Sequence, residues 1–108
     1  MTARANIYID RGADFNVSIE LYDDQDNPLD TTYCNFYSSI SKLYSTAPIA
    51  SFITGKHTGS VDLTMHANTS VNLDPGKYNY DVLMVNGNGE RFKIIEGLAF
   101  VTSTVTRI

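Results

Sequence analysis

Residues that carry chemistry are scarce in this sequence. Its 108 residues include one cysteine, two histidines and no tryptophan. Because a single cysteine cannot form an internal disulfide, we expect a fold that needs no bridge and a chain made in a reducing cytosol. The 8 basic and 12 acidic residues give a formal net charge of −4. This balance argues against a nucleic-acid-binding surface and against a cationic membrane face.

Signals for membrane insertion and secretion are also missing. No apolar run approaches the roughly 20 residues that a membrane-spanning helix needs. The segment from Met1 to Asn6 lacks the apolar core of a signal peptide. We therefore expect a chain made in the cytoplasm, with no membrane partner and no nucleic-acid partner.

The residues most often used in catalysis are dispersed. Cys34 shares one face of a predicted strand with Phe36 and Ile40, so we predict a small core residue and not a nucleophile. His57 and His66 lie outside any recognisable hydrolase motif, and no Cys or carboxylate spacing typical of a metal site accompanies them. We expect no enzyme activity, no cofactor, no bound metal and no small-molecule substrate.

The densest acidic run is Asp23–Pro28. Several carboxylates together suit a hard cation such as calcium. Counted from Asp24, however, the sixth position of an EF-hand loop is Leu29 where glycine is needed, and the twelfth is Asn35 where glutamate is needed. Asp and Asn side chains also stabilise turns, so we predict a turn here.

The sequence is rich in β-strand patterns. It is 43% hydrophobic, with seven tyrosines and five phenylalanines. Apolar and polar residues alternate over several short segments, as in half-buried strands. The predicted strands are Asn6–Asp10, Phe15–Tyr22, Cys34–Lys42, Ile49–Thr54, Ser60–Met65, Lys77–Val85 and Glu90–Val105, the last with a bulge near Glu96 and Gly97.

The segments between the strands carry turn signals. Gly55–Gly59 is predicted to be a loop, and Asn86-Gly87 favours a type I′ hairpin turn. Ala67–Val71 predicts one turn of helix, which Val71 and Leu73 would hold against the core.

The most specific run places a Pro-Gly turn directly before a strand. Pro75 sets φ for the turn, and Gly76 can adopt a positive φ. The pattern Leu73-x-Pro75-Gly76-x-Tyr78 resembles the tyrosine corner of immunoglobulin-like sandwiches, in which a tyrosine bonds back to the backbone a few residues upstream. The alternative is an ordinary hairpin turn followed by a core tyrosine.

These segments predict one all-β domain over residues 1–108. The expected fold is an antiparallel immunoglobulin-like β-sandwich of about seven strands, with one short helical turn before the tyrosine-corner strand.

Further runs extend the resemblance along the chain. They are Arg11-Gly12-x-Asp14-Phe15-Asn16, Asn27-Pro28-Leu29-Asp30, Tyr33-x-x-Phe36, Ser41-Lys42, Ala50-Ser51-Phe52, Leu73-x-Pro75-Gly76-x-Tyr78-x-Tyr80-Asp81-Val82, Glu96-Gly97 and Val105-Thr106-Arg107. With them the chain resembles a family of small immunoglobulin-like proteins and domains encoded among the tail and virion genes of tailed bacteriophages. It is similar to the N-terminal domain of siphophage upper baseplate proteins.

The resemblance implies a non-enzymatic structural component of a phage particle, in the tail, baseplate or neck. Such a chain acts through protein–protein contacts with other phage structural proteins, or with copies of itself, and its location is the virion. Exposed tyrosines can anchor such contacts, so Tyr22, Tyr37 and Tyr44 are possible interface residues. Alternatively, they only cover half-buried surface. The alternative function is a small ligand-binding module, for a carbohydrate or calcium.

Overall fold

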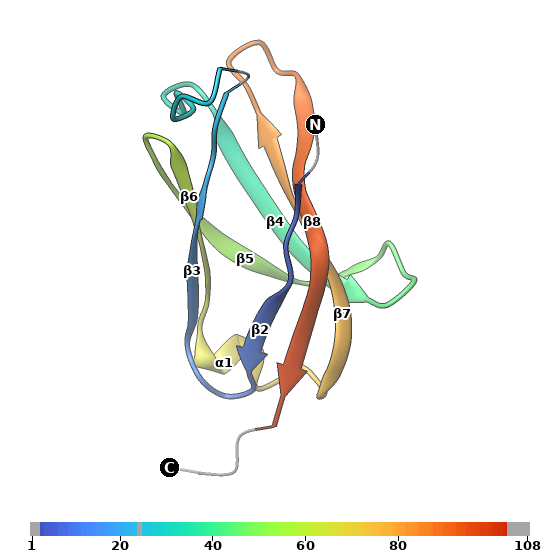
Figure 1. The fold of residues 1–108 in the computed structure, drawn as a ribbon. Helices are drawn as coiled ribbons and strands as arrows, with labels where there is room; N and C mark the ends of the chain where they lie inside the picture. Colours follow the sequence, from blue (N-terminus) through green and yellow to red (C-terminus); the bar gives the residue numbers. More distant parts are fainter. Residues whose placement is uncertain (1–2, 24, 104–108) are drawn as a thin grey trace.

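In the computed structural model the described part of the chain folds into β-strands and one short helix (Figure 1). The structure describes residues 3–23 and 25–103. Asp24 of the acidic run, and the predicted strand end at Val105 with the rest of the Val105-Thr106-Arg107 run, lie outside the described residues. The strands are β1 (Ala3–Arg4), β2 (Ile7–Asp10), β3 (Phe15–Glu20), β4 (Asn35–Lys42), β5 (Pro48–His57), β6 (Ser60–Met65), β7 (Gly76–Val85) and β8 (Arg91–Thr102), and the helix is α1 (Ala67–Ser70). The predicted all-β class is confirmed.

The strands form one curled sheet. Their order is β1-β8-β7-β4-β5-β6-β3, and β2 also pairs with β8. The curl depends on β5, which pairs with β4 through residues 48–52 and with β6 through residues 53–57. The sheet thereby bends so that β3 and β6 face β7 and β8 across a common core (Figure 1).

The N-terminal strands depart from the antiparallel arrangement that the sequence predicted. Both β1 and β2 run parallel to β8, with Ala3 opposite Ile95 and Ile7 opposite Ala99. The other strand pairs of the described residues are antiparallel. Alternation in a short segment indicates which side chains face the core, but not which neighbouring strand it pairs with.

The core consists of the inward-facing residues of both halves of the sheet. Aromatic rings cross it: the Phe52 ring lies 5.9 Å from the Phe15 ring and 6.3 Å from the Tyr80 ring, between centroids. Removal of these apolar surfaces from water is the main force that holds the two halves together. The largest of the fully buried side chains are Ile9, Ile40, Val61, Leu63, Met65, Ser70, Val82 and Ile95.

The segment Gly55–Gly59, predicted to be a loop, is mostly strand. β5 continues to His57, and a two-residue turn that ends at Gly59 leads into β6. Gly59 has a φ of +80°, which favours glycine. The Lys56 ammonium donates to the Cys34 carbonyl at 2.8 Å. That contact joins residues far apart in the sequence, so local patterns give no sign of it.

The predicted bulge in β8 is present, but it lies at Ile94, two residues before Glu96. The register between β7 and β8 shifts between Val82 and Leu83, so Ile94 has no partner of its own. The two adjacent isoleucines, at positions 94 and 95, mark the position of the bulge better than Gly97 does. Gly97 pairs with Tyr80 outside the bulge and lies against the backbone of Ala5.

The hairpin between β7 and β8 forms as predicted, but without a type I′ turn. Gly89 has a positive φ, +81°, whereas Asn86 does not, and a type I′ turn needs positive φ at both central residues. The Asn86 side chain accounts for the difference. Its Oδ1 accepts hydrogen bonds from the backbone N–H groups of Asn88 and Glu90, each at 3.0 Å, and this favours a longer loop.

The predicted helical turn is present as α1, but Ser70 holds it in place instead of Val71. Val71 is exposed, while Leu73 is buried as expected. The buried Ser70 hydroxyl accepts from the Gly12 N–H at 3.0 Å and donates to the Ala13 carbonyl at 3.1 Å. A small polar side chain with both partners satisfied is stable in this position.

Candidate functional site

The Leu73–Tyr78 turn is a structural element. The buried Tyr78 hydroxyl donates to the Asp74 carbonyl, four residues upstream, at 2.5 Å. Loss of water contact, followed by the negative charge of Asp74, raises the pKa of Tyr78. Gly76 has a φ of +148°, a conformation that disfavours other residues. Pro75 is exposed, whereas Leu73 before it and Tyr78 after it are buried. The turn is therefore anchored to the core at both of its ends.

A second tyrosine fixes the start of the chain. The Tyr80 hydroxyl donates to the Ala5 carbonyl at 2.6 Å, and burial raises the pKa of Tyr80. The Asn6 side chain accepts from the Leu98 N–H at 3.2 Å. These bonds hold the link between β1 and β2 close to Gly97 in β8.

This link forms one wall of a groove on the side of β4, β7 and β8 that points away from the core. The groove has a volume of about 680 Å³. The opposite wall is the loop between β4 and β5, and the base carries small polar side chains and charges. The polar lining residues of the strands include Ser39, Ser41, Asn79, Asp81 and Glu96.

The charges in the groove are mixed. Glu96 lies 3.4 Å from the Arg4 guanidinium and 3.5 Å from the Lys93 ammonium, measured between nitrogen and oxygen atoms. All three side chains contact solvent, so these pairs contribute little to stability. The groove therefore offers hydrogen-bond donors and acceptors of both charges rather than a field of one sign.

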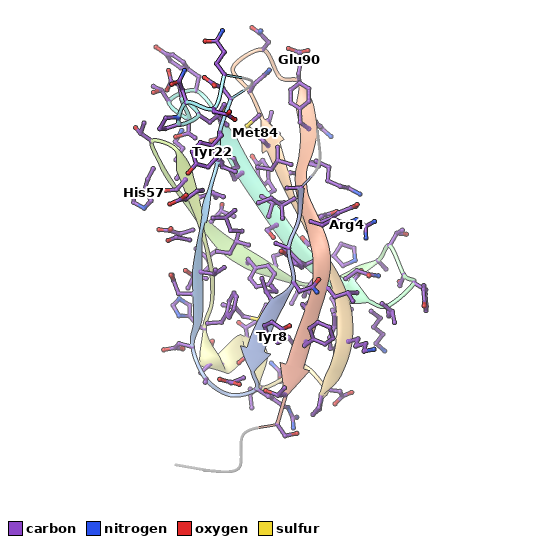
Figure 2. All side chains as sticks on the ribbon, in the orientation of Figure 1. Arg4, Tyr8, Tyr22, His57, Met84 and Glu90 are labelled. Carbon is purple, nitrogen blue, oxygen red and sulfur yellow. The ribbon has the colours of Figure 1, made fainter. Side chains whose placement is uncertain are left out.

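The three predicted interface tyrosines do not form one patch. Tyr37 lies on the outer side of β4, opposite Leu83 of β7, and is exposed. Tyr44 lies in the β4–β5 loop, which forms one wall of the groove, but neither tyrosine is among the residues that line the groove. Tyr22 lies beyond β3, at the other side of the molecule from Arg4 (Figure 2). The three tyrosines thus lie on β4, in the β4–β5 loop and beyond β3, and each is exposed.

Tyr22 has a local partner. Its hydroxyl donates to the Glu20 carboxylate at 2.5 Å. That hydrogen bond, and then the negative charge of Glu20, raise the pKa of Tyr22. The ring is nevertheless exposed at this edge of the fold.

Tyr44 is the most exposed of the three, at 95%. Its φ is +64°, which is uncommon for a bulky residue. The loop is braced around it: the Ser45 N–H donates to the Lys42 carbonyl at 2.9 Å, and the Ser41 hydroxyl donates to the Ser45 carbonyl at 2.8 Å. The backbone is therefore ordered while the tyrosine ring points into solvent.

Two carboxylates in or beside the acidic run Asp23–Pro28 stabilise turns. Asp23 Oδ1 accepts from the N–H groups of Gln25 at 2.9 Å and Asn27 at 3.0 Å. Asp30 Oδ1 accepts from the Thr32 hydroxyl and N–H, which lowers the pKa of Asp30. Within residues 3–23 and 25–103, no group of three or more His, Cys, Asp or Glu side chains could hold a metal ion.

The isolated cysteine and histidines also have structural surroundings. Cys34 is buried, and its Sγ lies 4.0 Å from the Asp30 carbonyl. His57 Nε2 lies 2.8 Å from an Asp62 carboxylate oxygen, and Asp62 also accepts from the Ser18 hydroxyl. The Ser18 bond, followed by the His57 bond, lowers the pKa of Asp62. This chain of contacts joins β3, β6 and β5 on the outer surface.

No helix among the described residues has the length and apolar character to cross a membrane.

Comparisons with known proteins assign no family. No family model matches the sequence, and no curated protein matches it. Among solved structures, the chain is similar to an internalin-like protein of Listeria monocytogenes, with 17% identity and a TM-score of 0.47 over 95% of this chain. It is also similar to the fibronectin(III)-like modules of Clostridium thermocellum CbhA, with 14% identity and a TM-score of 0.48 over 99% of this chain and 93% of that one.

A third similar structure is the family 123 glycoside hydrolase of Clostridium perfringens, with 11% identity and a TM-score of 0.46 over 98% of this chain. The chain spans only 28% of the internalin-like protein and 24% of the hydrolase. Likenesses at this level carry no inference about what the chain does.

The groove was not anticipated from the sequence. Its base could have been recognised from small polar residues that alternate with buried ones, Ser39 and Ser41 in β4 and Asn79 and Asp81 in β7. Its walls could not, because they depend on the contact between the N-terminal link and Gly97.

Proposed function

We propose that this protein is a non-enzymatic structural component of a bacteriophage particle, in its tail, baseplate or neck, and that it acts through protein–protein contacts. Its location is then the virion, and its partners are other phage structural proteins. The proposal rests on the series of short sequence runs that resemble small phage virion proteins, above all the run from Leu73 to Val82.

We infer an immunoglobulin-like β-sandwich as the finer architecture. β3 and β6 form one layer and β4, β7 and β8 the other, with β5 contributing to both. Tyr78 stands near the start of β7 and bonds back to Asp74, as the corner tyrosine does at the start of strand F in such folds.

The observation that carries the proposed mode of action is the presentation of Tyr44. A bulky aromatic side chain, 95% exposed, is held at positive φ by a hydrogen-bonded loop. An exposed aromatic side chain on an ordered loop loses little conformational entropy when it is buried in an interface. Tyr37 is exposed on the outer side of β4, the strand that leads into this loop, and is a second candidate for contact with a partner.

A second function, the binding of a small ligand, is favoured by the groove itself. Its volume of about 680 Å³ lies in the range of ligand pockets, and its small hydroxyl and amide side chains suit a carbohydrate. Calcium has less support, because Asp23 and Asp30 already accept backbone hydrogen bonds. Isothermal titration with a glycan panel and with calcium separates this function from the first.

Peptide mass spectrometry on purified particles of the phage that encodes this chain tests the leading proposal. We expect abundant peptides at a copy number that matches a symmetric layer. Presence in the infected cell with absence from particles would overturn it.

A pair of variants tests the role of Tyr44 in assembly. We expect Tyr44→Ala to reduce incorporation into particles. The control is Tyr33→Ala, which removes a 79% exposed ring from the β3–β4 loop, away from the groove, and should leave incorporation unchanged. Equal incorporation of both variants would overturn the role of Tyr44.

A further inference from the structure

β3 ends the strand order of the sheet. It pairs with β6 over six residues, Phe15–Glu20, without a register shift. On its other side no strand of the described residues pairs with it. Proteins usually protect such an edge with proline, lysine, a bulge or a covering segment. β3 contains no proline, lysine or bulge.

The backbone groups on the open side can be identified. The Leu21 N–H donates to the Gly59 carbonyl at 2.8 Å, so the adjacent opposed residues, Glu20 and Ser60, form a non-hydrogen-bonded pair. Because the two kinds of pair alternate along an antiparallel ladder, the N–H and C=O groups of Asn16, Ser18 and Glu20 point away from β6. These three alternate residues can form backbone hydrogen bonds with a further strand.

The inward side chains next to this edge are incompletely covered. Phe15, Val17 and Ile19 are only partly buried. Their partners on β6 are buried to the last few per cent: Val61 and Leu63 are 0% exposed and Met65 is 1% exposed. An added strand would therefore bury apolar surface as well as pair backbone groups.

Two copies of β3 can pair with each other in antiparallel orientation, with compatible side chains opposite one another. With Ser18 opposite Ser18 of a second copy, Asn16 faces Glu20 and Val17 faces Ile19. Each hydrogen-bonded pair exchanges two backbone bonds. The Asn16 amide donates one hydrogen to Thr64 and has a second one for the Glu20 carboxylate. No like charges are directly opposed in this register.

We propose that a second copy of this chain pairs antiparallel with β3 across a two-fold axis at Ser18, which joins the two sheets into one. The same patch serves both copies, as a closed two-fold contact requires. β1 and β2 at the opposite end of the sheet offer a shorter edge, broken at Ala5 and Asn6. The contact is small, so we expect a dissociation constant on the order of tens of micromolar.

This inference rests on the proposed mode of action, protein–protein contact, and names one partner. Dimerisation of the purified chain and presence in phage particles are separate measurements, so either can fail while the other holds.

The first test is sedimentation velocity of the full chain from about 1 to 500 μM, a range that spans the expected constant. We expect a concentration-dependent monomer–dimer equilibrium. Ser18→Pro removes the outward N–H without touching the ladder to β6, and should abolish the dimer. Ser18→Ala is the matched control: it loses the Asp62 contact but keeps the N–H, and should still dimerise. A monomer at every concentration, or a dimer that persists in folded Ser18→Pro, would overturn the proposal.

Two further pairs of variants test the register. Asn16→Glu opposes like charges and should weaken the dimer about tenfold, whereas Asn16→Lys should not weaken it. Ser18→Cys places two sulfurs across the axis, where α-carbons about 5.5 Å apart permit a disulfide. Asn16→Cys leaves its two copies about 13 Å apart. We expect an oxidative cross-link at position 18 alone; a cross-link at 16 and none at 18 would overturn this register.

Discussion

The carbonyl oxygen of Ala5 lies 1.9 Å from the point where a β-carbon on residue 97 would stand. Gly97 is opposite Tyr80 in β7, and the Tyr80 hydroxyl donates to that same carbonyl at 2.6 Å. The N-terminal link runs along β8 and approaches it closely at Gly97, where the missing side chain lets the link reach Tyr80. Glycine is required here for close approach, and not for a positive φ or a bulge.

Gly97→Ala is expected to displace the N-terminal link, because the backbone carbonyl of Ala5 cannot share space with a β-carbon. Overpacking of this kind costs about 1–3 kcal/mol, measured as the free energy of unfolding in urea. The control is Gly55→Ala in β5, where the nearest atom to an added β-carbon is 3.9 Å away. Equal stability of both variants would contradict the expected role of Gly97.

Tyr78→Phe is expected to destabilise the fold by about 1 kcal/mol, the usual cost of one intramolecular hydrogen bond. The variant keeps the ring in the core and removes only the bond to the Asp74 carbonyl. Tyr37→Phe, at an exposed position of β4, serves as the control and should leave the unfolding free energy unchanged. If Tyr78→Phe is equally neutral, the residue is an ordinary core tyrosine.

Asp62 should make stability fall at acid pH. Its pKa in the folded state is lowered by the Ser18 and His57 bonds relative to about 3.9 for an unfolded aspartate. A lowered pKa means that the contribution is present above pH 4 and is lost as the pH falls through the folded-state value. A carboxyl NMR titration should show the lowered pKa, and Ser18→Ala should move it toward the ordinary value. An Asp62 pKa unaffected by Ser18→Ala would contradict this cause.

Local patterns predicted most of the strands and the face each presents. Ser60–Met65 has the predicted bounds, and the helical turn begins at Ala67 as expected. Two of the errors depend on contacts between residues distant in sequence. They are the parallel pairing of β2 with β8 and the role of Gly97. The extension of β5 to His57 instead follows from its hairpin with β6, which turns at Thr58 and Gly59.

The candidate surfaces were also only partly predictable from the sequence. Tyr37 and Tyr44 were identified as exposed tyrosines from their positions in the alternation and in a turn, and they are exposed. The groove was missed because its walls come from the N-terminal link and the β4–β5 loop. The open edge of β3 was missed because a sequence does not indicate which strand ends the sheet.

Tyr44 is expected to lower the stability of the fold. A non-glycine residue in the left-handed region costs about 1 kcal/mol, and asparagine tolerates that region better than tyrosine. Since Tyr44 is 95% exposed, its ring buries little apolar surface in compensation. Tyr44→Asn should therefore raise the free energy of unfolding by about 0.5–1 kcal/mol in urea titrations. Tyr33→Asn, at an exposed position outside the left-handed region, should not raise the free energy of unfolding.

A stabilised but assembly-defective Tyr44→Asn would mean that this tyrosine is retained for contact with a partner at the expense of stability. Loss of stability in Tyr44→Asn would instead mean that the ring packs against its own chain.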